Sequence, residues 1–192
     1  KSCGKADWKT QTCSSSSLAN EGKVFIRQLG TSEEDIPSDI SIDNLGNIYV
    51  TGYTEGAFDG NSNKGNEDFF LIKYSASGEK IWTRQHGSNS SDWARGIVID
   101  ASDNIILIGG TTGKLTGSKN LGSYDIFLVK YDSNGSIQWT QQIGTSTVDD
   151  GHAVTTDSSD SIYITGRTWG GLDGSNKPNV CKNVTSTARE IC

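Results

Sequence analysis

The chain has 192 residues and a formal net charge of −6, and hydrophobic residues make up only 33% of it. The negative charge disfavours generic binding to nucleic acid and to anionic membrane surfaces, and no apolar run reaches the roughly 18 residues of a transmembrane helix. Glycine is abundant, with 23 residues, and proline is scarce, with 2, a composition that favours many short strands joined by tight turns.

The first 22 residues are predicted to form an N-terminal extension that contains Cys3 and Cys13. Since the chain begins with Lys1, contains no Met and has no apolar signal-like segment, we expect it to be processed, trimmed or part of a longer chain.

The other two cysteines, Cys181 and Cys192, lie in a predicted C-terminal tail over residues 175–192. Four cysteines confined to the two ends predict disulfides that hold the tails in an oxidising, extracytoplasmic compartment. The pairing stays open, although Cys3–Cys13 with Cys181–Cys192 requires the least chain closure. Neither spacing matches that of a zinc knuckle, so no metal or other cofactor is predicted.

Between these ends, residues 23–174 contain a 57-residue repeat whose units start near residues 25, 82 and 139. Gly30, Gly87 and Gly144 keep the same step, as do many other residues of the three units. In the second unit, four strand-like runs are separated by turn residues. These runs cover residues 95–99, 104–109, 125–131 and 136–142.

Four strands in each unit are typical of the blades of a β-propeller, in which neighbouring blades bury each other's faces. The pattern D-x-F-L-V-K-Y-D-x-x-G-x-x-x-W-T-x-Q-x-G, followed by I-x-x-D-x-x-x-N-I-Y-x-T-G-x-T, resembles the bacterial SBBP repeat over about residues 24–174. This resemblance implies a propeller of the seven-bladed type and a secreted or cell-surface protein.

We therefore predict an all-β chain with about three blades of four antiparallel strands. In the family's strand order, residues 24–28 form one outer strand, two complete blades follow, and the third blade has two strands. The tail over residues 179–189 is a candidate for one more strand. Three blades cannot close a ring, because natural propellers have about four to eight. The chain is thus expected to be half of a six-bladed homo-oligomer or a piece of a longer propeller.

Residues that recur in every unit are interpreted as structural. Asp35, Asp92 and Asp149 follow the recurring glycine and precede the inner strand, where a carboxylate can accept backbone N–H groups and fix the turn. Lys73 and Lys130 recur in the third strand and are expected to pack against the blade with a solvated ammonium group.

No catalytic residue is predicted. Gly-x-Ser-x-Gly is absent, and the two histidines offer little material for a serine or cysteine triad. An enzyme would need a metal or polar cluster in the central channel around Arg95 and His152.

The candidate ligand-binding residues are those that break the repeat on one loop face. They are Trp93, Arg95, His152, Arg167 and Trp169. Exposed Trp and Arg are frequent in binding hot spots, although Trp93 and Trp169 could equally pack against a neighbouring blade. Several acidic residues, Asp92 and Asp150 among them, fall on the same face and suggest a basic partner, a cation or simple solubility.

The sequence thus predicts a non-catalytic, extracellular or cell-surface module that binds a protein or a glycan, without nucleic-acid binding or membrane insertion. The alternative is a structural propeller that assembles with copies of itself and has no ligand of its own.

Overall fold

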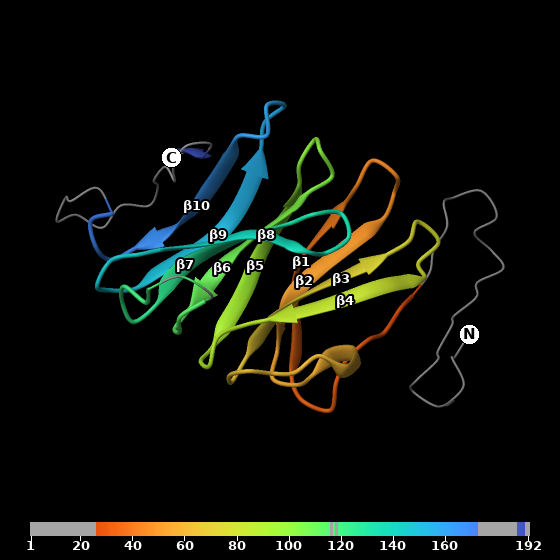
Figure 1. Ribbon diagram of the computed structural model, residues 1–192, viewed down its shortest axis with the longest axis horizontal. Helices are drawn as coiled ribbons and strands as arrows, with labels where there is room; N and C mark the ends of the chain where they lie inside the picture. Colours follow the sequence, from red (N-terminus) through yellow and green to blue (C-terminus); the bar gives the residue numbers. More distant parts are fainter. Residues whose placement is uncertain (1–25, 116, 118, 173–187, 191–192) are drawn as a thin grey trace, which may run out of the picture. The chain divides into compact units, whose positions relative to one another are not determined.

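The computed structural model describes residues 26–115, 117, 119–172 and, for the backbone, 188–190. Its strands form three sheets (Figure 1). The first sheet, blade 1, has the order β1-β2-β3-β4. Its strands are β1 (Asp35–Ile42), β2 (Ile48–Thr54), β3 (Asp68–Tyr74) and β4 (Lys80–His86), with a short 3-10 turn, η1 (Phe58–Gly60), between β2 and β3.

Blade 2 repeats this order as β5-β6-β7-β8, and all neighbouring strands in both blades are antiparallel. Its strands are β5 (Asp92–Ile99), β6 (Ile105–Thr111), β7 (Asp125–Tyr131) and β8 (Ile137–Ile143). The prediction of four-stranded antiparallel blades is therefore confirmed.

Blade 3 has the order β11-β10-β9. It contains β9 (Asp149–Thr156), β10 (Ile162–Thr168) and the short β11 (Ala188–Glu190), which runs parallel to β10. The C-terminal tail thus supplies a further strand, but it is parallel, whereas the second and third strands of the complete blades are antiparallel.

An outer strand was expected over residues 24–28, but its described part, residues 26–28, adopts no strand. A strand is stabilised by the hydrogen bonds of a neighbouring ladder, and residues 26–30 belong to none. The four cysteines lie outside the described residues, as do most of the predicted tails.

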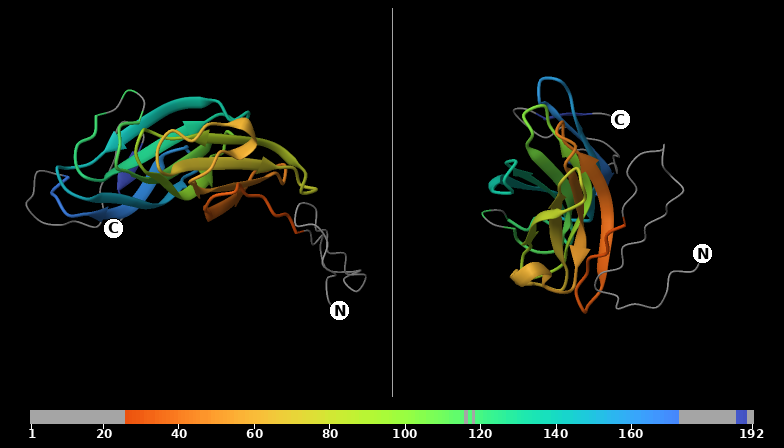
Figure 2. Two further views of the ribbon diagram at one scale, coloured as in Figure 1. Left: turned by 90° about the horizontal axis from the view of Figure 1, so that it is seen from below. Right: turned by 90° about the vertical axis from the view of Figure 1, so that its right-hand side faces the viewer.

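Two apolar clusters join the blades, and blade 2 lies between the other two (Figures 1 and 2). Strand alternation sends Leu107 and Phe127 towards blade 1, where they pack with Leu71. Ile106 and Leu128 point the other way and belong to the cluster that contains residues of β10. Blade 2 is therefore apolar on both faces, which explains the continuous run of buried residues along β6.

Turn carboxylates fix the backbone as the repeat predicts. Asp35 Oδ2, Asp92 Oδ2 and Asp149 Oδ2 each accept the backbone N–H of the residue four positions earlier, at 2.5, 2.6 and 2.6 Å. The structural interpretation of these three residues is confirmed.

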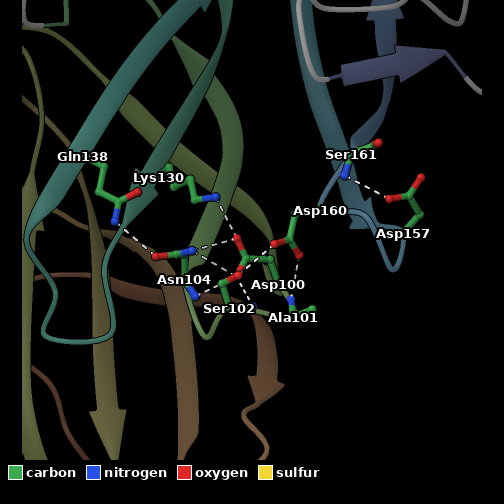
Figure 3. A network of polar contacts seen from close by, with 9 residues as sticks. All are labelled: Asp100, Ala101, Ser102, Asn104, Lys130, Gln138, Asp157, Asp160 and Ser161. Atoms are coloured by element: carbon green, nitrogen blue, oxygen red, sulfur yellow. Dashed lines mark hydrogen bonds and ion pairs between the residues drawn. The ribbon is translucent and has the colours of Figure 1, made fainter.

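A second set of turns ties blade 2 to blade 3 (Figure 3). Asp160 has a positive φ of 59° in its turn, and its carboxylate accepts hydrogen bonds from Ala101 N and Ser102 Oγ, both at 2.9 Å. In blade 2 the Lys130 ammonium group lies 2.7 Å from the buried Asp100 carboxylate. This ammonium group is therefore paired with a carboxylate that has no access to water, although the Lys130 side chain keeps part of its own exposure.

Candidate functional site

The candidate site begins with an irregularity that recurs in the inner strand of every blade. Between β1 and β2, Pro37 pairs with Gly52 and Asp39 with Thr51, which leaves Ser38 without a partner. The same one-residue bulge leaves Arg95 unpaired in β5 and His152 unpaired in β9. A β-bulge turns its extra residue out of the regular alternation of the strand.

Glycines in the second strands keep these bulges tight. At Gly109 a Cβ atom would lie 2.0 Å from the carbonyl oxygen of Trp93, far inside contact distance. Gly52 and Gly166 hold the equivalent positions beside Ile36 and Asp150. Only glycine permits this approach of the two backbones, and the recurring glycine of the second strand is the sequence signal of the bulge.

The three bulge residues converge on one pocket of about 530 Å³. This volume lies within the range of pockets that hold small ligands. It is lined by Ser38, Arg95, Asp150, His152 and Arg167. Three of the five predicted binding residues thus come together, and each of the three blades contributes to the pocket.

Asp150 is the centre of this group. Arg95 Nε donates to its Oδ1 at 3.1 Å, while His152 Nε2 and Arg167 Nη2 lie 3.1 and 3.5 Å from its Oδ2. The Asp150 side chain is only 3% exposed, whereas those of Arg95, His152 and Arg167 are 40%, 51% and 54% exposed. The carboxylate therefore lies beneath these three side chains and holds them at the rim of the pocket.

Tyr124 completes the support of Arg95. Arg95 Nη2 donates to Tyr124 Oη at 3.3 Å. Burial and the charge of Asp150 raise the pKa of Tyr124 to about 12, so its hydroxyl stays protonated in neutral solution. The Tyr124 ring stacks on Trp93, with centroids 5.2 Å apart and planes inclined by 17°. Arg95 is thus fixed at two of its nitrogens by groups that are themselves packed.

The two tryptophans have different environments. Trp93 is half-buried between Tyr124 and Tyr53 and does not line the pocket. Trp169 directly follows β10, two residues after Arg167, and is 67% exposed. Of the two, only Trp169 offers a large aromatic surface to a ligand.

The interpretation of this face as acidic was wrong for two of its residues. Asp92 and Asp150 are 0% and 2% exposed, because Asp92 accepts hydrogen bonds in its turn and Asp150 lies under the cations. Sequence reasoning placed Asp150 among the surface acids and missed its role. The sequence feature that could have indicated this role is the break in the repeat, because Asp150 occupies the position held by Ile36 and Trp93 in the other two units.

The described residues contain no group of three or more His, Cys, Asp or Glu side chains arranged to hold a metal ion. No helix among them is long and apolar enough to cross a membrane.

Comparison with known proteins agrees with the blade geometry. The model of the SBBP family, described as a beta-propeller repeat, matches residues 24–63 and 138–173. These two segments, which together make up less than half of the chain, match the SBBP beta-propeller repeat. The resemblance in sequence and the two matched segments thus lead to the same family, and blade 2 repeats the same strand order between those segments.

Two curated relatives contain regions similar to this chain. An uncharacterized WD repeat-containing protein of Acanthamoeba polyphaga mimivirus is 28% identical over 156 residues, which are 70% of this chain and 10% of that protein. The regulatory protein FlaEY of Caulobacter vibrioides is 27% identical over 170 residues, which are 80% of this chain and 18% of that protein. The chain therefore spans less than a fifth of the length of either relative.

Proposed function

We propose that this SBBP-repeat chain is a non-catalytic binding module that acts outside the cytoplasm, in a secreted or cell-surface protein, and engages a protein or glycan ligand. The observation that carries the proposal is the convergence of Ser38, Arg95 and His152, one bulge residue from each blade, on a single pocket. These residues occupy equivalent backbone positions but differ in chemistry, as expected of a surface adapted to one ligand.

The scaffold around the pocket supports the same proposal. Arg95 is held by Asp150 and Tyr124, so little side-chain freedom is lost when a ligand binds. Binding residues placed on a rigid strand framework are typical of recognition sites in repeat proteins.

Screening the purified chain on glycan arrays and on a panel of extracellular proteins tests this proposal. Arg95→Ala and Arg167→Ala are compared with Lys114→Ala, which removes one positive charge from an exposed residue outside the pocket lining. We expect captured ligands to be lost with the two arginine variants and retained with the lysine variant. Ligands that bind all three variants like the wild type would overturn the proposal.

A second candidate function is structural assembly, which the outer face of blade 1 favours. Ile40 and Ile42 in β1 are 61% and 62% exposed, whereas Ile97, the equivalent of Ile40 in blade 2, is 6% exposed in the cluster with blade 1. Another blade could cover this face, from a second copy or from a longer chain. Light scattering of the wild type and of Ile40→Glu tests assembly. A monomeric wild type at high concentration excludes self-assembly.

A further inference from the structure

The charge of the pocket is opposite to that of the chain as a whole. The chain carries −6, but the pocket lining combines the guanidinium groups of Arg95 and Arg167 with the single carboxylate of Asp150. With a neutral His152, the lining therefore keeps about one net positive charge. Because Asp150 is buried beneath the two arginines, a ligand that enters the pocket meets the cations first.

Arg95 also has hydrogen-bonding capacity left for a ligand. Its Nε donates to Asp150 and its Nη2 to Tyr124, while its Nη1 has no hydrogen-bond partner among the residues that the structure describes. A planar guanidinium group held in this way can present N–H donors to a carboxylate in a fixed geometry. Since the arginine is already ordered, the interaction loses little conformational entropy.

We propose that the pocket binds an acidic glycan through a sugar carboxylate, an inference that rests on the proposed binding function. All five lining residues are polar or charged, and none offers the apolar core on which protein partners rely. Ser38 and His152 supply groups that can hydrogen-bond sugar hydroxyls. Trp169 does not line the pocket, but it follows Arg167 by two residues and its exposed ring is a flat amphipathic surface of the kind that stacks on a sugar face.

The test measures binding of the full chain to three probes by calorimetry at low salt. The first is an oligogalacturonate, the second is its methyl ester, and the third is a hexaglutamate peptide. We expect the oligogalacturonate to bind and the neutral ester to bind at least about tenfold more weakly, because the ester lacks the charge that the arginines recognise. The peptide, which has the charge without the sugar, is expected to bind more weakly as well.

Two substitutions examine the site itself. Arg95→Gln and Arg167→Gln should each weaken oligogalacturonate binding by about tenfold or more. Lys114→Gln, which changes the net charge by the same amount, should stay within about twofold, as expected of a surface charge. Arg167 is 54% exposed, so its variant tests the proposal even if Arg95→Gln does not fold.

Three results would overturn the inference: equal affinity for the ester, tighter binding of hexaglutamate, or unchanged affinity of both arginine variants. No detectable binding of the oligogalacturonate counts against it as well. The proposed function can stand where this inference fails. If the chain captures a neutral glycan or a protein, and the arginine variants no longer bind it, the pocket is a binding site but not one for a sugar acid.

Discussion

Replacing Asp68 by Asn should stabilise the fold at neutral pH, although it alters a fully buried residue. Asp68 Oδ2 accepts hydrogen bonds from Lys64 N at 2.9 Å and Gln85 Nε2 at 3.3 Å, but its Oδ1 has no partner among the described residues. Gly87 packs against both this carboxylate and that of Asp92, so two buried acids lie around one glycine. A neutral side chain of the same shape keeps the acceptor and removes the charge.

The size of the effect follows from the unpaired oxygen. A buried polar atom without a hydrogen bond costs about 1–3 kcal/mol. In the Asp68→Asn variant, the amide oxygen still accepts from Lys64 and Gln85, and the amide N–H groups turn towards Asp92, so we expect a gain of about 1 kcal/mol. For a chain of this length, this raises the Tm by about 2–4 °C.

The gain should depend on pH. Burial raises the pKa of Asp68, and the charge of Asp92 raises it further against the opposing hydrogen bonds of Lys64 and Gln85. A raised pKa means that the folded state holds the proton more tightly than the unfolded state. The stability that this tighter proton binding adds is complete below the pKa of the unfolded state, about 3.9, and is lost as the pH rises through the pKa of the folded state. The advantage of Asp68→Asn should therefore be largest at about pH 7 and vanish near about pH 3.5.

Thermal and urea unfolding of both proteins between about pH 3.5 and pH 7 measures this difference. Asp35→Asn is the matched control, because both oxygens of Asp35 already accept hydrogen bonds, from Thr31 and Thr54. Here the amide removes an acceptor, and we expect a loss of about 1 kcal/mol. A destabilised Asp68→Asn protein at neutral pH, or a gain that does not change with pH, would refute the reasoning.

Four further substitutions test the packing of the blades. Lys130→Met should cost about 3–5 kcal/mol at neutral pH, because it leaves the buried Asp100 carboxylate without its cation. Burial raises the pKa of Asp100, but hydrogen bonds from Lys130 and Asn104 outweigh burial and hold that pKa below its usual range. The penalty should therefore shrink as the pH falls through this pKa in acid unfolding experiments. Ile97→Ala should cost about 2–5 kcal/mol by urea unfolding and Ile40→Ala, at the exposed equivalent position, less than about 0.5 kcal/mol, whereas equal losses would indicate that another blade covers Ile40. Gly109→Ala should abolish cooperative unfolding, since its Cβ would lie 2.0 Å from a carbonyl oxygen of β5.

The sequence predicted the strands of the repeat better than their ends. The third strand of blade 2 was expected over residues 125–131 and is observed as Asp125–Tyr131. The first was expected to begin at Arg95 but begins at Asp92. Pairing continues to Asp92 because the bulge at Arg95 absorbs one residue and restores the register with β6. Since a bulge depends on the partner strand, the sequence of one strand does not show it.

The candidate site was predictable as a set of positions but not as a network. The repeat register places Arg95 and His152 at equivalent positions, and the break in the repeat singled them out. That Asp150 joins them depends on packing between blades, because its carboxylate reaches across from β9 to Arg95 in β5. Contacts of this kind lie 55 residues apart in the sequence and follow from no local pattern.

The bulges explain how one repeat can vary the residues around this pocket without losing its fold. Residues of the regular ladder are constrained on both sides, since Leu107 and Leu128 each fill a cluster between blades. The extra residue of a bulge has no cross-strand partner and points into the pocket, so its replacement costs little packing. Serine, arginine and histidine can therefore occupy the same position of three successive units. The recurring part of the repeat holds the backbone, and the position that the ladder leaves unpaired varies the chemistry of the pocket from one unit to the next.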